Sequence, residues 1–267
     1  MSSSNLIPRY NQVDQLTRGL DLPFVALQEE HLFVMAEALV LAWNDLLISQ
    51  GATLRTGSEA EINALMATRL SQLIDEHSLW EQMVRSVTRG TETVSFDGGH
   101  LEKRPDLSIH LTARNPAFPL IVECKLIDAP RRKTAELYCD QGLRRLLSGE
   151  YSWATREAFM LAYVRDGSSV ASALNPLLAA SRTRQPQPYT IEDMPTPIAF
   201  GSLDLARTRH GRLFRYPTRP TPRDDPGTIT LWHLWLTSVV PQTTASQATN
   251  LTIETDALNN SAPATIS

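Results

Sequence analysis

Two stretches in the middle of the chain, residues 104–111 and 120–127, alternate between apolar and polar side chains in a way that is typical of strands. Successive side chains of a strand point to opposite faces of a sheet, so each stretch separates into two sets. In the second stretch every second residue is apolar, and Glu123 and Lys125 lie on the other face. Asp106 lies on the polar face of the first stretch. If the two strands are neighbours, Asp106, Glu123 and Lys125 converge on one side of a sheet whose other side is core.

Apolar residues at helical spacing predict two helices ahead of these strands. The first covers residues 28–50, and the GATLRTG stretch that starts at Gly51 marks a break. The second starts at Ser58, which suits an N-cap because Glu61 follows at the capping-box position. Other helices are expected at residues 78–87 (a short helix or a helix end), 131–147 and 170–180.

Further strands are expected on either side of the central pair. They cover residues 92–96, 157–164, 197–206 and 228–237, with a hairpin signal at residues 97–99 and a proline-rich surface loop at residues 183–198. The order helix, hairpin, strand, helix, strand predicts an α/β fold with a mixed central sheet flanked by helices. We divide the chain into an N-terminal lead and helix (1–57), an α/β domain that ends in C-terminal strands (58–240) and a tail expected to be disordered (241–267).

The composition narrows the class of protein without indicating a reaction. With 267 residues, of which 42% are hydrophobic, the chain can bury one sizeable core. Its two cysteines, Cys124 and Cys139, form neither a disulfide framework nor a zinc motif. The N-terminus has no secretory signal pattern, and no apolar run reaches the length of a membrane span. We therefore expect a cytoplasmic protein with no membrane contact.

The charges are unevenly distributed, although the net charge is only −4. Residues 1–103 hold 14 acidic and 7 basic residues, whereas residues 104–226 hold 13 acidic and 18 basic residues. The electropositive part of the chain thus begins at the strand that carries Asp106. Such a distribution suits a region that binds phosphate groups.

The three residues on the polar face of the central strands suggest chemistry at a metal ion. Two neighbouring carboxylates repel each other unless a cation lies between them, and hard oxygen ligands favour Mg²⁺ or Mn²⁺. A lysine on the same face can orient water or offset negative charge on a phosphoryl oxygen. The alternative is a solvated Glu-x-Lys ion pair of little energetic value, preceded by a common Pro-Asp turn dipeptide.

With the order of elements added, the sequence resembles the PD-(D/E)xK nuclease superfamily, which has the restriction-endonuclease-like fold. The matching residues are Pro105-Asp106 on the second hairpin strand and Glu123-Cys124-Lys125 on the third strand. The superfamily also has a glutamate on the preceding helix, where Glu59 is the first choice and Glu61 the second. The helix after the third strand is similar to that of defence-associated members. Its matching residues are Gln141, Arg145, Gly149 and Tyr151.

The resemblance implies a role for each matching residue. Asp106, Glu123 and the backbone carbonyl of Cys124 would bind Mg²⁺ or Mn²⁺, and Glu59 would reach the metal through water or help a second ion to bind. Lys125 would place the attacking water. Other implied roles belong to Gln141, which would help to position the site, and to Arg145 and Arg104, which would bind nucleic acid.

The resemblance therefore implies a magnesium-dependent DNA endonuclease of a restriction or anti-phage defence system. The chain has no GxxxxGK[ST] loop, so an ATP-driven step would require an ATPase or helicase partner. A homodimer would allow cleavage of both DNA strands. Two alternatives remain: a catalytically silent nucleic-acid-binding module on a nuclease fold, and an assembly protein in which residues 120–127 are simply a core strand with an ion pair.

Overall fold

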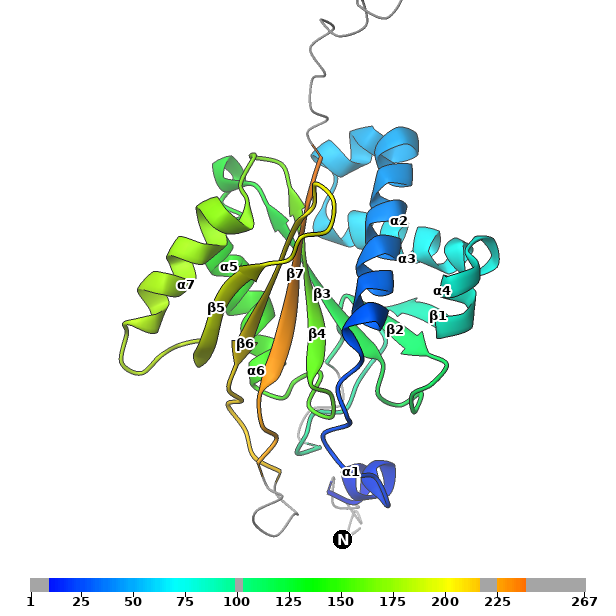
Figure 1. The fold of residues 1–267 in the computed structure, drawn as a ribbon, viewed down its shortest axis with the longest axis vertical. Coiled ribbons are helices and arrows are strands. Elements are labelled where there is room, and N and C mark those ends of the chain that lie inside the picture. Colours follow the sequence, from blue (N-terminus) through cyan, green and yellow to red (C-terminus); the bar gives the residue numbers. More distant parts are fainter. Residues whose placement is uncertain (1–9, 99–102, 217–224, 239–267) are drawn as a thin grey trace, which may run out of the picture.

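The computed structural model describes residues 10–98, 103–216 and 225–238, and these form one seven-stranded sheet with helices on both faces (Figure 1). The strand order is β1-β2-β3-β4-β7-β6-β5. The strands are β1 (Val84–Arg89), β2 (Leu107–Leu111), β3 (Leu120–Ile127), β4 (Glu157–Val164), β5 (Ile191–Pro197), β6 (Asp204–His210) and β7 (Ile229–Thr237). The prediction of an α/β fold with a mixed central sheet is confirmed.

The centre of the sheet is parallel and its two edges are antiparallel. Strand β3 pairs in parallel with β4, and β4 pairs in parallel with β7. On one side β1 and β2 form an antiparallel hairpin that pairs antiparallel with β3, and on the other side β6 and β5 extend β7. Every residue of β3 and β4 is buried, because helices cover both faces of these central strands.

The helices fall into two layers. In Figure 1, α2 (Glu29–Thr56), α3 (Glu59–Glu76) and α4 (Ser78–Met83) lie to the right of the central strands. On the left lie α5 (Ala135–Tyr138), α6 (Arg144–Leu147) and α7 (Asn175–Arg182). The remaining helical segments are α1 (Tyr10–Thr17), a 3₁₀ turn at Ala129–Arg131 and two π-helical segments at Cys139–Leu143 and Val170–Leu174.

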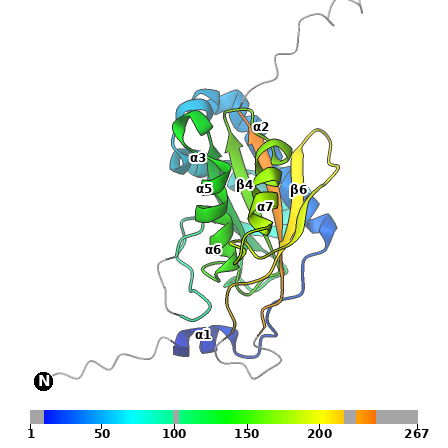
Figure 2. The ribbon, with the colours of Figure 1, turned by 90° about the vertical axis from the view of Figure 1, so that its left-hand side faces the viewer.

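Each layer has its own hydrophobic core. The apolar face of β3, with Cys124 at its centre, packs against α2 and α3, so the prediction that Cys124 is a core residue is confirmed. The opposite face, from Ile121 to Ile127, packs against the helical segments around Tyr138. A third, smaller cluster contains Val13 of α1, Phe118 and Trp153. Figure 2 shows α1 below the ends of the strands.

The first long helix continues well beyond the break expected at Gly51. Helix α2 runs to Thr56, with a kink where Gln50 leaves helical geometry (φ −133°, ψ 22°), and it ends at Gly57. By length and composition α2 meets the criterion for a membrane-spanning helix, which corrects the expectation that no segment does. Its buried face, however, packs on the sheet, and core helices of proteins outside membranes pass the same test.

The strand that pairs with β2 is not the predicted one. Residues 92–96 contribute only an isolated bridge between Thr93 and Lys103, whereas β1 occupies residues expected to end a helix. A register shift between Val84 and Ser86 marks a bulge in β1. Because the bulge adds a residue, Val84 and Val87 both face the core although they are three positions apart. Their spacing therefore imitates a helix.

The region expected to be a proline-rich loop contains an edge strand. Strand β5 includes Pro195 and Pro197, and its pairing with β6 is irregular at two points. An edge strand tolerates proline because one side of its backbone needs no sheet partner. The following strand, expected at residues 197–206, is β6 and begins only at Asp204, after a turn in which Gly201 has φ +60°.

The helix predicted at residues 131–147 begins at Ala135 and is interrupted by the π-helical segment Cys139–Leu143. Strands β3, β4 and β7 and the capping box of Ser58 and Glu61 are found where they were predicted. Gly99 of the predicted hairpin and the predicted disordered tail (241–267) lie outside the described residues.

Candidate functional site

The candidate site forms where β3 continues past the beginning of β2. Leu107, the first residue of β2, pairs with Val122, so the following part of β3 has no strand partner on that side. The backbone N–H of Cys124 donates instead to Asp106 Oδ2 at 2.8 Å, and that of Leu126 donates to Glu59 Oε2 at 2.8 Å. Backbone donors that would otherwise lack a partner thus position two of the predicted carboxylates.

Four oxygen atoms surround the ammonium group of Lys125. Its Nζ lies 2.7 Å from the carbonyl oxygen of Cys124, 2.8 Å from Glu123 Oε1, 3.3 Å from Asp106 Oδ2 and 3.5 Å from Glu59 Oε1. The structure therefore brings together all the side chains that the alternating pattern assigned to one face, and it adds Glu59 from α3. The centre of the cluster is a point at which a single cation contacts three carboxylates and a carbonyl.

The two candidate glutamates of α3 have different positions. Glu59 reaches β3, whereas Glu61 accepts hydrogen bonds from the backbone N–H of Ser58 (2.7 Å) and from its hydroxyl (2.8 Å). Those hydrogen bonds lower the pKa of Glu61 and complete the capping box. Behind Asp106, Asn63 donates to Oδ1 at 3.0 Å and accepts from the buried hydroxyl of Tyr163. Asn63 was not predicted as a site residue, because it is a single polar residue on the apolar face of a helix.

The electrostatics of the cluster are dominated by burial. Glu123 is fully buried, and burial, together with repulsion from Asp106, raises its pKa to about 8. Lys125 and Arg145 oppose this shift. Burial also acts against the charged form of Lys125, but Glu123, Asp106 and Glu59 outweigh it and raise the pKa of the ammonium group. Among the described residues, none forms a hydrogen bond with Glu123 Oε2.

The helical segments after β3 close the site from the other side. Gly142 lies in the π-helical segment, and a Cβ built there would be 2.8 Å from Met160 Cε and 3.4 Å from Glu123 Cγ. A Cβ at this position would require the Met160 side chain to move, so a glycine favours the close approach of this segment to β3 and β4. Sequence analysis did not single out Gly142, although a glycine within an apolar helical pattern often marks such an approach.

A cavity of about 170 Å³ lies over the cluster. Arg145 borders it and contacts Glu123 Oε1 at 3.2 Å while its side chain remains 41% exposed. Gln141 and Lys133 are exposed residues on the same lining, and Lys133 was not among the predicted residues. The site therefore has an acidic base and a basic rim, which is the charge pattern expected where a phosphate group approaches bound cations.

The side chain of Arg104, which was predicted to bind nucleic acid, lies away from the cluster. Its guanidinium pairs with Glu92 at 2.6 Å on the surface, where both side chains are more than half exposed. Its backbone carbonyl accepts a hydrogen bond from the hydroxyl of Tyr151 at 3.0 Å. Arg144, the neighbour of Arg145 in the chain, is exposed.

No family model matches this chain, and searches of curated proteins and of solved structures likewise found no match. Within the described residues, no group of three or more histidine, cysteine, aspartate or glutamate side chains is arranged around a vacant metal position. The carboxylates of the candidate site instead surround an ammonium group.

Proposed function

We propose that this chain is a metal-dependent nuclease with a restriction-endonuclease-like core, acting as a DNA endonuclease. The observation that carries the proposal is the convergence of Glu59, Asp106, Glu123 and the carbonyl of Cys124 on one cation position. Two strand-end hydrogen bonds hold Glu59 and Asp106 in place without help from Lys125. A structural ion pair would require none of this additional positioning.

The residues present fit a divalent cation of the Mg²⁺ or Mn²⁺ type. All four atoms are hard oxygens, which these ions prefer, and Glu123 Oε2 is a buried acceptor that lacks a partner among the described residues. Asp106, Glu123 and the carbonyl of Cys124 would hold the ion, with Glu59 at the outer side. When bound, such an ion lowers the pKa of coordinated water and neutralises charge on a phosphate oxygen.

The chain's own residues supply the positioning. With a divalent cation held by these oxygens, the Lys125 side chain would donate to the attacking water and to a non-bridging phosphate oxygen. Arg145 and Lys133 at the rim of the cavity would contact the phosphate backbone, and Gln141 would help to orient the water. The net reaction adds water across the P–O3′ bond and leaves a 5′-phosphate and a 3′-hydroxyl.

The competing candidate is a silent binding module, because Lys125 already neutralises the carboxylates without a metal. Plasmid cleavage by the full chain with Mg²⁺ or Mn²⁺, compared with EDTA, decides between the two. We expect nicked and linear DNA that requires the metal and disappears in the variant Asp106→Asn. An intact plasmid with both metals, at high protein concentration, would overturn the enzymatic proposal in favour of the binding module.

A further inference from the structure

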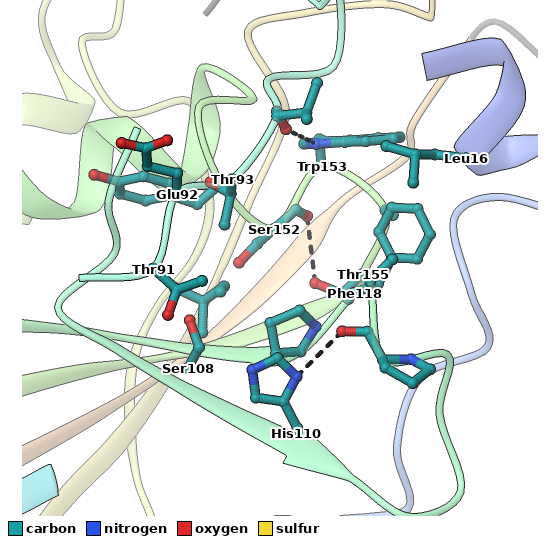
Figure 3. A pocket seen from close by; sticks show the side chains of 17 residues that line it. Leu16, Thr91, Glu92, Thr93, Ser108, His110, Phe118, Ser152, Trp153 and Thr155 are labelled. Carbon is teal, nitrogen blue, oxygen red and sulfur yellow. Dashed lines mark hydrogen bonds between the residues drawn. The ribbon is translucent and has the colours of Figure 1, made fainter. Parts of the chain in front are cut away.

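A second cavity, of about 260 Å³, lies against the polar face of β2 (Figure 3). Ser108 and His110 of β2 form one wall together with Ile121 of β3, while Phe118 and Trp153 form another. The two aromatic rings contact each other edge to face, with centroids 5.3 Å apart. The cavity is therefore mainly apolar and aromatic, with polar groups at a few points.

Two hydroxyl groups in this cavity are buried without partners. Ser108 and Ser152 are 1% and 7% exposed, and no hydrogen bond to either side-chain oxygen is found among the described residues. Figure 3 shows both hydroxyls turned toward the space between β2 and the segment around Ser152. A buried hydroxyl without a partner loses its hydrogen bonds to water and gains none in return, so a ligand with a polar edge would remove this cost.

The other polar groups limit what the ligand can be. Both ring nitrogens of His110 are engaged, with the Thr88 hydroxyl at 3.3 Å and the Pro116 carbonyl at 3.1 Å. No lysine or arginine lines the cavity, and Glu92 is its one charged lining residue among those described. A phosphate or another anion would find no counter-charge here. An aliphatic ligand would leave both hydroxyls unpaired, so a flat, neutral ligand with a polar edge fits best.

Two features of the chain connect the lining of this cavity to the candidate site, although the two cavities share no lining residue. Asp106 comes directly before β2 and Ser108 is the second residue of β2, so their Cα atoms are at most about 7 Å apart. Tyr151 lines the cavity and donates its hydroxyl to the carbonyl of Arg104, two residues before Asp106. A nucleotide next to a phosphate held at Lys125 is therefore within reach of the cavity.

We propose that this cavity binds one nucleobase of the substrate strand, taken out of the base stack beside the scissile phosphate. Extruded bases bind in pockets where apolar or aromatic side chains cover the ring and polar groups read its edge, as Phe118, Trp153 and the two serine hydroxyls would do here. The cavity is slightly smaller than the roughly 300–1,000 Å³ of drug-sized pockets, which suits a single base. This inference rests on the proposed nuclease function, and it adds a site that selects the nucleotide to be cut.

Saturation-transfer NMR on the full chain without metal tests the cavity directly, with deoxyadenosine, deoxyguanosine, deoxycytidine and thymidine as the probes. We expect saturation of the base protons of at least one nucleoside, reduced about fivefold in Ser108→Ala because one hydrogen bond is lost. The matched control is Ser181→Ala, which removes a buried hydroxyl, also without a partner among the described residues, from α7 outside the cavity. The absence of a signal from all four nucleosides, or an equal signal in Ser108→Ala, would overturn the inference.

Mapping of cleavage positions on DNA of random sequence then separates the two proposals. A preference for one base beside the cut that Ser108→Ala loses and Ser181→Ala keeps supports the inference. Metal-dependent cleavage with the same preference in wild type and Ser108→Ala would leave the nuclease proposal standing and overturn the base site. Nucleoside binding that depends on Ser108, without any DNA cleavage, would support the cavity and overturn the nuclease.

Discussion

Two buried polar clusters lie next to each other in this protein, and they satisfy their polar groups to different degrees. In the first, around Lys125, three carboxylates compete for one ammonium group, and Glu123 Oε2 has no partner among the described residues. In the second, on β6 and β7, His233 and His210 are buried and every ring nitrogen has a partner. Tyr138 joins them, because it lines the candidate active site and its hydroxyl contacts His233.

The hydrogen bonds of the histidine cluster can be followed from one carbonyl group. The carbonyl of Tyr189 can only accept, so His210 donates its Nδ1–H to it at 2.7 Å. With His210 neutral, the Thr208 hydroxyl donates to His210 Nε2 and therefore accepts from His233 Nε2. The Tyr138 hydroxyl lies 2.8 Å from His233 Nδ1 and donates to the carbonyl oxygen of Met160 at 3.1 Å. Burial lowers the pKa of His210 to about 4 and that of His233 to about 3.

This comparison separates a polar cluster that stabilises a core from one that is prepared for a ligand. The histidine cluster gains nothing from another group, because its donors and acceptors are paired with each other. The Lys125 cluster retains an acceptor without a partner among the described residues and a carboxylate whose pKa is raised to about 8, and under the proposed function these are the groups that a divalent cation would contact. Strongly perturbed carboxylates in a cavity are a common mark of functional sites.

The largest expected effect comes from removing charge at the first cluster. Glu123→Gln should lower the rate of metal-dependent DNA cleavage at least about 10²–10³-fold, because an oxygen ligand is exchanged for a neutral amide. The variant should nevertheless unfold at the same temperature or a higher one without metal, since it removes a buried carboxylate. Cleavage assays and thermal unfolding of the same preparations check both parts. Retained cleavage would exclude Glu123 from the site.

The second cluster should respond to mutation in the opposite way. His233→Leu leaves the hydroxyls of Tyr138 and Thr208 without their ring partner, which should lower the free energy of unfolding by about 2–4 kcal/mol. Cleavage per folded molecule should stay close to that of the wild type. Chemical denaturation and active-site titration measure the two quantities. A loss of cleavage without a loss of stability would show that the histidine cluster takes part in function.

The two clusters should also give opposite dependences of stability on pH. The pKa of Glu123 is raised from 4.5 to about 8, so without metal its contribution to stability falls as the pH rises through this window. The pKa values of His210 and His233 are lowered from 6.5, so their contribution is lost as the pH falls from 6.5 toward 4. Unfolding temperatures measured from pH 4 to 9 should lose the alkaline decline in Glu123→Gln.

Because a bound cation displaces the proton of Glu123, Mg²⁺ should raise the unfolding temperature more at pH 8.5 than at pH 6. The same titration with Glu123→Gln serves as the control and should show a small shift that does not depend on pH. An equal Mg²⁺ effect in both proteins would mean that the ion binds elsewhere.

The smallest expected effect is a difference in cleavage rate between variants of two glutamates of α3, Glu59 and Glu61. Glu59→Gln should slow cleavage about tenfold, because Glu59 lies at the outer side of the proposed metal position, whereas Glu61→Gln should leave the rate unchanged. Glu61→Gln should lower the unfolding temperature slightly, since it weakens the capping box. Cleavage rates and unfolding temperatures of the pair, measured side by side, check this. Equal cleavage by both variants would remove Glu59 from the site.

The spacing of apolar residues in the sequence predicted the strands that are regular and buried. Strands β3, β4 and β7 were predicted because long apolar or alternating runs persist where a strand is buried. Strands β1 and β5 were missed because a bulge gives β1 a helix-like spacing of buried residues and because prolines at an edge imitate a loop. Both errors arise from irregular pairing, which depends on the neighbouring strand and leaves no mark in the local pattern.

By itself, the sequence determined which side chains share a face of β3, because alternation is a local property of the strand backbone. It thereby grouped Glu123 with Lys125 and assigned Cys124 to the core. Only the tertiary structure decided that β3 continues beyond its pairing with β2. The backbone N–H groups of Cys124 and Leu126 have no strand partner on that side, and they orient Asp106 and Glu59 instead. The tertiary structure also decided that Gly142 lets the π-helical segment close over the cluster, and that Arg104 pairs away from it. Such facts depend on strand register and on distances between segments far apart in the chain, which local patterns do not encode.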